Sequence, residues 1–251
     1  MKDFSLLAYK QLLIYFRTNN YNFFTYEQYL NEKIKPKKFV ILRHDVDRKA
    51  CNALKMASLE NELDINASYY FRIVKGSNQP SIIKKIAKLG HEIGYHYEDL
   101  SSSGGNYLKA IKSFESNLEY FNNYYPIKTI CMHGSPWSKW DNKDLWKKYN
   151  YKNYGVLTEP YFDIDFNKIF YLTDASRAWN NEKVTIRDKV NSDFIIPINS
   201  IFDIFNLLQL NKLPNQLMLN VHPHNWTNIT IEWTTIKIWQ KLKNKIKSFL
   251  T

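Results

Sequence analysis

The chain contains six histidines, and their positions are not scattered along it. All of them lie in or just after four short apolar runs, beside Asp, Glu, Gly or Pro: His44, His91, His96, His133, His222 and His224. Imidazole nitrogens bind divalent metals and exchange protons near neutral pH. We expect the apolar runs to be strands, so the histidines gather at strand ends. This clustering indicates a functional site rather than packing alone.

Several of these histidines and their acidic neighbours are spaced two residues apart. The pairs are Asp45 with Asp47, His96 with Glu98, and His222 with His224. Residues at this spacing face the same side of a strand. Two carboxylates so close repel each other, which raises the pKa of one unless a cation lies beside them. A divalent metal bound by Asp and His removes that repulsion and supplies a water nucleophile.

A purely structural interpretation of the aspartate pair stays open. Arg43 and Arg48 flank the two aspartates, and would form ion pairs with Asp45 and Asp47 respectively at a strand end. His44 alternates away from the aspartates in a regular strand, so we predict a structural role for it.

The elements that must position these residues follow from the hydrophobic pattern. Short apolar runs alternate with segments of helical spacing, which predicts an α/β fold. The predicted strands are 39–42, 67–74, 91–97, 127–132, 170–173, 194–198 and 216–221, and helical patterns cover 4–16, 50–57, 81–89, 108–121 and 233–249. In a barrel or a doubly wound sheet of about seven strands, ligands gather at the carboxyl ends of the strands.

Length and composition narrow the class of protein. The 251 residues contain no linker or repeat, which predicts a single domain over 1–251. The net charge of +11 comes mostly from scattered lysines, so we expect no nucleic-acid partner. The apolar segment 4–16 is interrupted and lacks a cleavage site, and no run suits a membrane span. With only two cysteines, Cys51 and Cys131, these features predict a cytoplasmic protein.

Several segments together resemble the polysaccharide deacetylase family, carbohydrate esterase family 4. Residues 40–47 are similar to a variant first motif with Asp-x-Asp. Residues 90–96 are similar to the second motif, in which a Gly-His-Glu strand leads to a metal-binding histidine. Residues 219–223 resemble the late strand that presents the catalytic histidine. Residues 131–136 and 172–179 match a subgroup associated with bacterial surface-polysaccharide gene clusters.

The resemblance implies an irregular (β/α) barrel and a metal-dependent hydrolase that removes an acetyl or similar N-acyl group from an amino sugar. It implies that Asp47 and His96 bind a divalent cation, which we predict to be zinc. Asp45 would act as base on the water, and His222 would protonate the leaving amine. The absence of a secretion signal favours an N-acetylated sugar linked to a nucleotide or a lipid, during surface-polysaccharide biosynthesis.

One position departs from the family pattern. The usual second motif has another metal-binding histidine four residues after the first, and here Leu100 stands at that place. The third ligand must then be Glu98, which shares a strand face with His96, or His133 on a neighbouring strand end. We predict His133, because an imidazole then replaces the missing imidazole. His91 faces the other way in a regular strand, and we predict it to be structural.

Further residues beside the motifs are candidates for substrate binding. Asp174, Arg177, Trp179, His224 and Trp226 form this set, and Tyr95, Trp137 and Trp140 are other aromatic residues near the motifs. Aromatic faces stack on sugar rings, and an Asp–Arg pair fixes an anionic group or forms an internal ion pair. Because of Leu100, a catalytically degenerate protein of the same fold that only binds carbohydrate is the alternative function.

Overall fold

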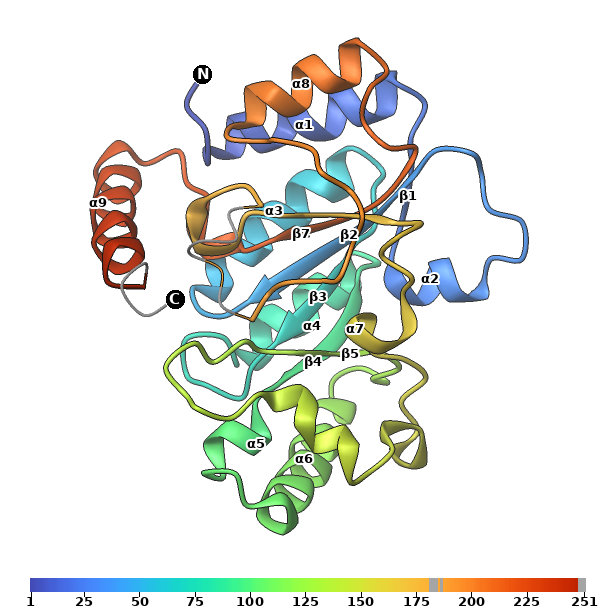
Figure 1. The fold of residues 1–251 in the computed structure, drawn as a ribbon, viewed down its shortest axis with the longest axis vertical. Helices are drawn as coiled ribbons and strands as arrows, with labels where there is room; N and C mark the ends of the chain where they lie inside the picture. Colours follow the sequence, from blue (N-terminus) through green and yellow to red (C-terminus); the bar gives the residue numbers. More distant parts are fainter. Residues whose placement is uncertain (181–184, 186, 248–251) are drawn as a thin grey trace.

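The computed structural model describes residues 1–180, 185 and 187–247, and its centre is one parallel sheet (Figure 1). Seven strands form it: β1 (Asn22–Phe24), β2 (Phe39–Val46), β3 (Ser68–Phe71), β4 (Glu92–Tyr97), β5 (Ile130–Met132), β6 (Phe170–Thr173) and β7 (Gln216–Val221). Their order is β5-β4-β3-β2-β7-β6, and β1 pairs with the first residues of β2. Every ladder is parallel. The predicted α/β fold of about seven strands is confirmed.

The sheet curves as a half-barrel and does not close. Within the described residues, no strand ladder joins the two outer strands β5 and β6. The predicted strand at 194–198 has no regular secondary structure, and the short strand Asn22–Phe24 was not predicted. Three residues give too short a pattern to distinguish from a loop, whereas apolar residues at 194 and 196 pack on the core from an extended segment.

Helices surround the sheet and form most of the connections between strands. They are α1 (Leu6–Thr18), α2 (Tyr26–Asn31), α3 (Ala50–Glu62), α4 (Pro80–Lys88), α5 (Asp99–Ser102), α6 (Tyr107–Asn122), α7 (Pro160–Asp163), α8 (Ile201–Gln209) and α9 (Thr230–Lys247). Short 3₁₀ helices are η1 (Asn142–Lys147), η2 (Tyr151–Tyr154), η3 (Ala175–Arg177) and η4 (Pro223–Asn225). None of the described helices is both long and apolar enough to cross a membrane.

Strand β2 is the central element, and all eight of its residues are buried. Apolar side chains account for its first four residues, as expected for a parallel strand covered on both faces. Its second half is polar, with Arg43, His44 and Asp45 each at most 2% exposed. Buried polar groups need partners, so this half of β2 must meet polar side chains from its neighbours.

Helix α9 lies at the margin of the molecule (Figure 1) and differs from its sequence pattern. Residues 233–249 suggested one continuous apolar face. In the structure Ile236 is buried, whereas Trp239, Leu242 and Ile246 are about half exposed. Trp233 and Leu242 are nine residues apart, which places them on opposite sides of a helix with about 3.6 residues per turn. Residue 249 lies outside the described residues.

Candidate active site

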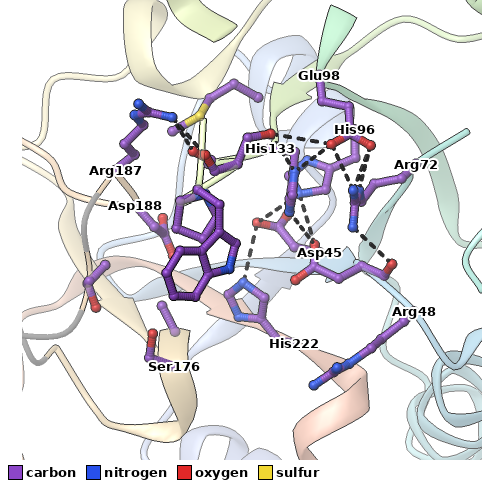
Figure 2. A pocket seen from close by; sticks show the side chains of 18 of the residues that line it. Asp45, Arg48, Arg72, His96, Glu98, His133, Ser176, Arg187, Asp188 and His222 are labelled. Carbon is purple, nitrogen blue, oxygen red and sulfur yellow. Dashed lines mark hydrogen bonds and ion pairs between the residues drawn. The ribbon is translucent and has the colours of Figure 1, made fainter. Parts of the chain in front are cut away.

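A cavity of about 430 Å³ lies at the carboxyl ends of the strands (Figure 2). Polar side chains at or just after the ends of five strands line it: Asp45 and Asp47 from β2, Arg72 from β3, His96 from β4, His133 from β5 and His222 from β7. The structure therefore brings together the five residues predicted to be catalytic or metal-binding. It also places Glu98 and His224 in the cavity wall.

The register of the ladders explains how distant residues meet. His96 pairs with Cys131 across β4 and β5, and the amide of His133 donates to the carbonyl of Tyr97. On the other side of β2, Arg43 pairs with Asn220 of β7. Side chains from opposite halves of the chain thus share one edge of the sheet.

Oδ1 of Asp47 lies between two histidines. This oxygen lies 3.4 Å from Nε2 of His96 and 3.5 Å from Nε2 of His133. The same oxygen is buried and has no hydrogen-bond partner among the described residues. A buried carboxylate oxygen without a partner is costly, which makes this oxygen a candidate metal ligand.

The other nitrogen of each histidine fixes the tautomer. Nδ1 of His96 lies 2.9 Å from the carbonyl oxygen of Cys131, so it donates there. Nδ1 of His133 lies 3.0 Å from Oε2 of Glu98 and donates to that carboxylate. Both Nε2 atoms then carry lone pairs that face Asp47. Metal-binding histidines have this arrangement, with the second ring nitrogen held by a carboxylate or a carbonyl.

The separations also suit a small divalent ion. Two ligand atoms about 2.1 Å from one tetrahedral ion lie about 3.4 Å from each other. The two separations from Asp47, 3.4 and 3.5 Å, match this value. Asp47 therefore lies at ligand-like distances from both histidines, and the tautomers and the unpaired oxygen also suit a metal. The two histidines would have to draw closer to share one ion with Asp47, because no described group that contains both has all its ligand atoms within 4.8 Å of one another.

Glu98 supports His133 in this arrangement instead of facing Asp47. Arg72 donates to both of its carboxylate oxygens, at 2.7 Å each. Burial by itself would raise the pKa of Glu98, but His133 and Arg72 outweigh it and lower that pKa to about 2. Glu98 is therefore an ionised acceptor that orients the imidazole of His133.

A second group of candidate ligands was not found from the sequence. Asp45, His96 and Cys131 each offer a ligand atom, and these atoms lie within 4.8 Å of one another. Their closeness follows from the β4–β5 register, which no sequence motif reveals. Burial raises the pKa of the Cys131 thiol far above its ordinary value, and metals bind the thiolate. The set around Asp47 differs from this second group in having an unpaired carboxylate oxygen and two histidines whose other ring nitrogens are already held.

Asp45 lies in a polar network of its own. Arg43 donates to both oxygens of Asp45, at 2.9 and 2.6 Å, and Asn220 donates to Oδ2 at 3.1 Å. Burial alone would raise the pKa of Asp45, but the adjacent Arg43 guanidinium lowers it below its usual range. The Arg43–Asp45 ion pair of the structural alternative is present. Its Arg48–Asp47 counterpart is not found among the described side chains.

His222 is held by Asp174, which follows β6. Nδ1 of His222 lies 2.6 Å from Oδ1 of Asp174, and Nε2 lies 3.9 Å from Oδ2 of Asp45. Burial would lower the pKa of His222, but the hydrogen bond and the charge of Asp174 raise it to about 10. The imidazole is therefore protonated at neutral pH, with Nε2–H directed toward the aspartate side of the cavity.

Only some of the residues predicted to bind substrate line the cavity. Trp226 and Trp179 are buried in the core, and Trp226 donates to Asp174 at 2.6 Å. Arg177 donates to the carbonyl of Trp233 and does not line the cavity. His224 does line it, and burial lowers the pKa of its imidazole well below the usual value.

Other cavity residues were missed or only hinted at by the sequence. Trp137 lies on the cavity wall and is 64% exposed. In the sequence, only its position four residues after His133 indicates a place near the site. Tyr161, Arg187 and Asp188 also line the cavity. None of the three stands in a motif: Tyr161 lies on the short helix α7, and Arg187 and Asp188 lie in an irregular segment.

Comparison with known proteins gives remote structural likenesses. No protein-family model and no curated protein matches the chain. A wild-type pseudoenzyme of the CE4 family from Bacillus anthracis is 14% identical, with 82% of this chain and 61% of that one covered and a TM-score of 0.44. A family 4 carbohydrate esterase from Bacillus anthracis is 14% identical, with 94% and 86% covered and a TM-score of 0.45.

A third similar structure is the Xyl-CE4 domain of a multidomain xylanase from the hindgut metagenome of Trinervitermes trinervoides. It is 12% identical, with 84% of each chain covered and a TM-score of 0.41. The chain spans under two thirds of the pseudoenzyme, at 61% of its length. At such low identities and TM-scores, none of these likenesses assigns an activity to this chain.

Proposed function

We propose that the chain is a metal-dependent hydrolase that removes the acetyl group from an N-acetylated amino sugar. One observation carries this proposal: Asp47 Oδ1 and the Nε2 atoms of His96 and His133 converge in the same cavity as the protonated His222. A cation site beside a proton donor is what hydrolysis of an unactivated amide requires. The resemblance of the motifs to polysaccharide deacetylases adds the substrate class.

In this proposal Asp47, His96 and His133 hold the divalent metal, with zinc as the expected ion because its usual ligands are carboxylates and imidazoles. A bound metal polarises the amide carbonyl and lowers the pKa of water to about 7. Glu98 and the carbonyl of Cys131 keep the two imidazoles turned toward Asp47. These partners fix the ligands before the metal arrives.

Asp45 takes a proton from the attacking water. Its carboxylate is ionised, and Arg43 and Asn220 hold it in one orientation. Because Arg43 and Asn220 stabilise its ionised form, Asp45 is a weak base, and a bound metal would supply the acidity of the water. The new C–O bond forms as the amide carbon becomes tetrahedral.

His222 gives its Nε2 proton to the amine nitrogen as the C–N bond breaks. Asp174 keeps the proton on the imidazole until then and fixes the ring through Nδ1. Acetate and the free amino sugar leave, and a general acid of this kind typically contributes on the order of 10²–10⁴ in rate.

The proposed substrate is an amino sugar still attached to a nucleotide or lipid carrier, used in surface-polysaccharide biosynthesis in the cytoplasm. The two cysteines are free thiols, as a reducing compartment requires. The motif resemblance supplies the pathway.

A carbohydrate-binding protein without turnover is the second candidate. Two observations favour it: Leu100 is fully buried and offers no ligand, and Arg43 lowers the basicity of Asp45.

Acetate release tests the proposal. Metal-depleted protein is assayed before and after Zn²⁺ is restored, on chitotriose, on UDP-N-acetylglucosamine and on prenyl-diphosphate-linked N-acetylglucosamine. We expect release only with metal, and an Asp45→Asn loss on the order of 10²–10⁴. Asp165→Asn is the matched control, because that residue pairs with Lys168 on the surface. If metal-loaded protein binds these sugars without releasing acetate, the binding protein is the correct description.

A further inference from the structure

Arg48 and Lys243 are cations of the cavity wall that form no ion pair with a described residue. Arg48 lies just before α3, and Lys243 lies on α9. Arg48 Nε is buried and forms no hydrogen bond with any described residue. In Figure 2 the Arg48 guanidinium reaches into the cavity below His222, and no dashed line meets it. Lys243 lies 5.3 Å from the ring centre of Trp239 and forms no ion pair with a described residue.

Other cations near the cavity do form ion pairs with carboxylates. Arg43 pairs with Asp45 at 2.6 Å, and Arg72 pairs with Glu98 at 2.7 Å. Lys49, next to Arg48 in the chain, pairs with Glu232 at 2.6 Å. Arg187, also on the cavity wall, donates to the backbone carbonyls of Gly134, Ser135 and Ser138. Arg48 and Lys243 therefore differ from these cations, because neither has a carboxylate or carbonyl partner among the described residues.

The two unpaired cations influence each other electrostatically. Burial lowers the pKa of Lys243, and the positive charge of Arg48 lowers it further. Arg48 also contributes to the lowered pKa of His224, after burial. Like charges held together in a partly enclosed space repel, and an anion between them removes the repulsion.

The backbone keeps Arg48 in place. The amide of Ala50 donates to the carbonyl of Gly76, and a methyl group at Gly76 would lie 3.3 Å from Cβ of Arg48. This close packing restricts where the side chain of Arg48 begins. On the other side, buried Ile236 and Gln240 attach α9 to the body and carry Lys243 to the cavity.

We propose that Arg48 and Lys243 form a subsite for the phosphate groups of a diphosphate-linked amino sugar, beside the acid His222. This inference rests on the proposed function and adds the chemical class of the carrier. A diphosphate has two charged groups, which suits two cations carried by separate elements. The planar guanidinium of Arg48 gives paired donors that match phosphate oxygens. Nucleotide and prenyl carriers share this diphosphate.

Binding measurements test the subsite independently of turnover. The zinc-loaded Asp45→Asn protein is titrated with UDP-N-acetylglucosamine, with prenyl-diphosphate-linked N-acetylglucosamine in detergent, and with neutral chitotriose. Charge-assisted hydrogen bonds contribute about 1.5–3 kcal/mol, so Arg48→Met should lower the affinity ratio of diphosphate-linked to neutral sugar about 10- to 100-fold. Lys243→Met should lower it in the same direction. Lys241→Met, on the same helix but outside this cavity, is the matched control and should leave the ratio unchanged.

The two carriers are separate arms of the experiment. Arg48-dependent binding of only one diphosphate-linked sugar supports the subsite and identifies the carrier. Unchanged ratios for both carriers in Arg48→Met and Lys243→Met would overturn it, even if acetate release is normal. If these ratios fall as expected but wild-type protein releases no acetate, the hydrolase proposal fails and the subsite stands.

Discussion

The six histidines divide between two regions of the molecule that use the same chemistry differently. The first region is a closed cluster around Glu60 of α3. Its carboxylate accepts from His44 at 2.8 Å and from the hydroxyls of Tyr9 and Tyr69 at 2.5 and 2.7 Å. His91 lies 3.6 Å away, and its nitrogens bond to backbone groups. The side chains of Glu60, His44 and His91 are completely buried, and they line none of the cavities described for the chain.

The second region is open and has an unpaired acceptor. The ring nitrogens facing Asp47 carry lone pairs, and Oδ1 of Asp47 has no donor among the described groups. The Glu60 cluster and the Asp47 site both combine histidine with carboxylate, so this combination by itself does not define a metal site. In the second region, acceptor atoms face one another beside a cavity. The N–H groups of the two histidines donate to other partners, namely the carbonyl of Cys131 and the carboxylate of Glu98.

The largest effect expected from this comparison is loss of metal on Asp47→Ala. Removal of the shared carboxylate should reduce bound metal from about one ion per chain to none, and acetate release should disappear with it. The thermal transition of metal-free protein should not fall, because the variant removes an unsatisfied buried acceptor. Elemental analysis and calorimetry of the same sample measure both quantities, and Cys131→Ser should keep its metal. Stoichiometric metal in Asp47→Ala would show that Asp45, His96 and Cys131 hold it instead.

Next in size is the effect of Asp174→Asn on the pH profile. His222 donates only while protonated, and its pKa of about 10 keeps the proton on the ring across neutral pH. The alkaline limb of the wild-type profile should therefore lie above the ordinary pKa of an imidazole, because Asp174 stabilises the protonated ring. Without the carboxylate of Asp174, burial lowers the pKa of His222, so the alkaline limb should move to lower pH.

The rate at neutral pH should then drop on the order of 10²–10⁴. Measurement of kcat against pH, with circular dichroism as a check on folding, tests this. An alkaline limb that stays in place would mean that another group donates the proton.

Substitutions in the closed cluster around Glu60 should lower the free energy of unfolding and leave the metal content unchanged. Glu60→Ala leaves the buried donors of His44, Tyr9 and Tyr69 without their acceptor, which should cost about 3–5 kcal/mol of unfolding free energy. Glu62→Ala is the control on the same helix, because Glu62 forms an exposed pair with Lys10 and should cost about 0–1 kcal/mol. Urea unfolding measures both. A folded Glu60→Ala sample should still bind one metal; if it cannot, the two regions are coupled and the comparison fails.

The smallest expected effect is that of Glu98, whose carboxylate holds His133, on metal affinity. Glu98→Gln keeps the shape of the side chain but weakens its hold on His133, and should lower metal affinity about 10- to 100-fold. His133→Ala removes a ligand and should lower that affinity more. Competition with a chromophoric chelator ranks the two. The reverse order would make Glu98 the ligand.

Much of this site was predictable from the sequence, because strand spacing and strand ends are local properties. The Asp45–Asp47 spacing and the histidines at 96, 133 and 222 follow from buried runs that each end in polar residues. The substrate-binding set was predicted less well. Trp226 stands beside a motif but points into the core, and only the packing of α1 against the end of β7 decides that.

Nonlocal contacts explain what the sequence did not reveal. Cys131 approaches His96 through the β4–β5 register, and Asn220 reaches Asp45 through the β2–β7 register. Both depend on which strands are neighbours, which periodicity does not encode. Arg187 and Asp188 enter the cavity from an irregular segment, where no period exists to read.

The central claim is that Asp47, His96 and His133 hold one divalent metal, and a crystal structure of zinc-soaked protein tests it most directly. Diffraction data on both sides of the zinc absorption edge locate the ion without reference to any assay. We expect one anomalous peak about 2.0–2.2 Å from Asp47 Oδ1 and from the Nε2 atoms of His96 and His133. A peak bound instead by Asp45, His96 and Cys131, or no peak in the cavity at all, would contradict it.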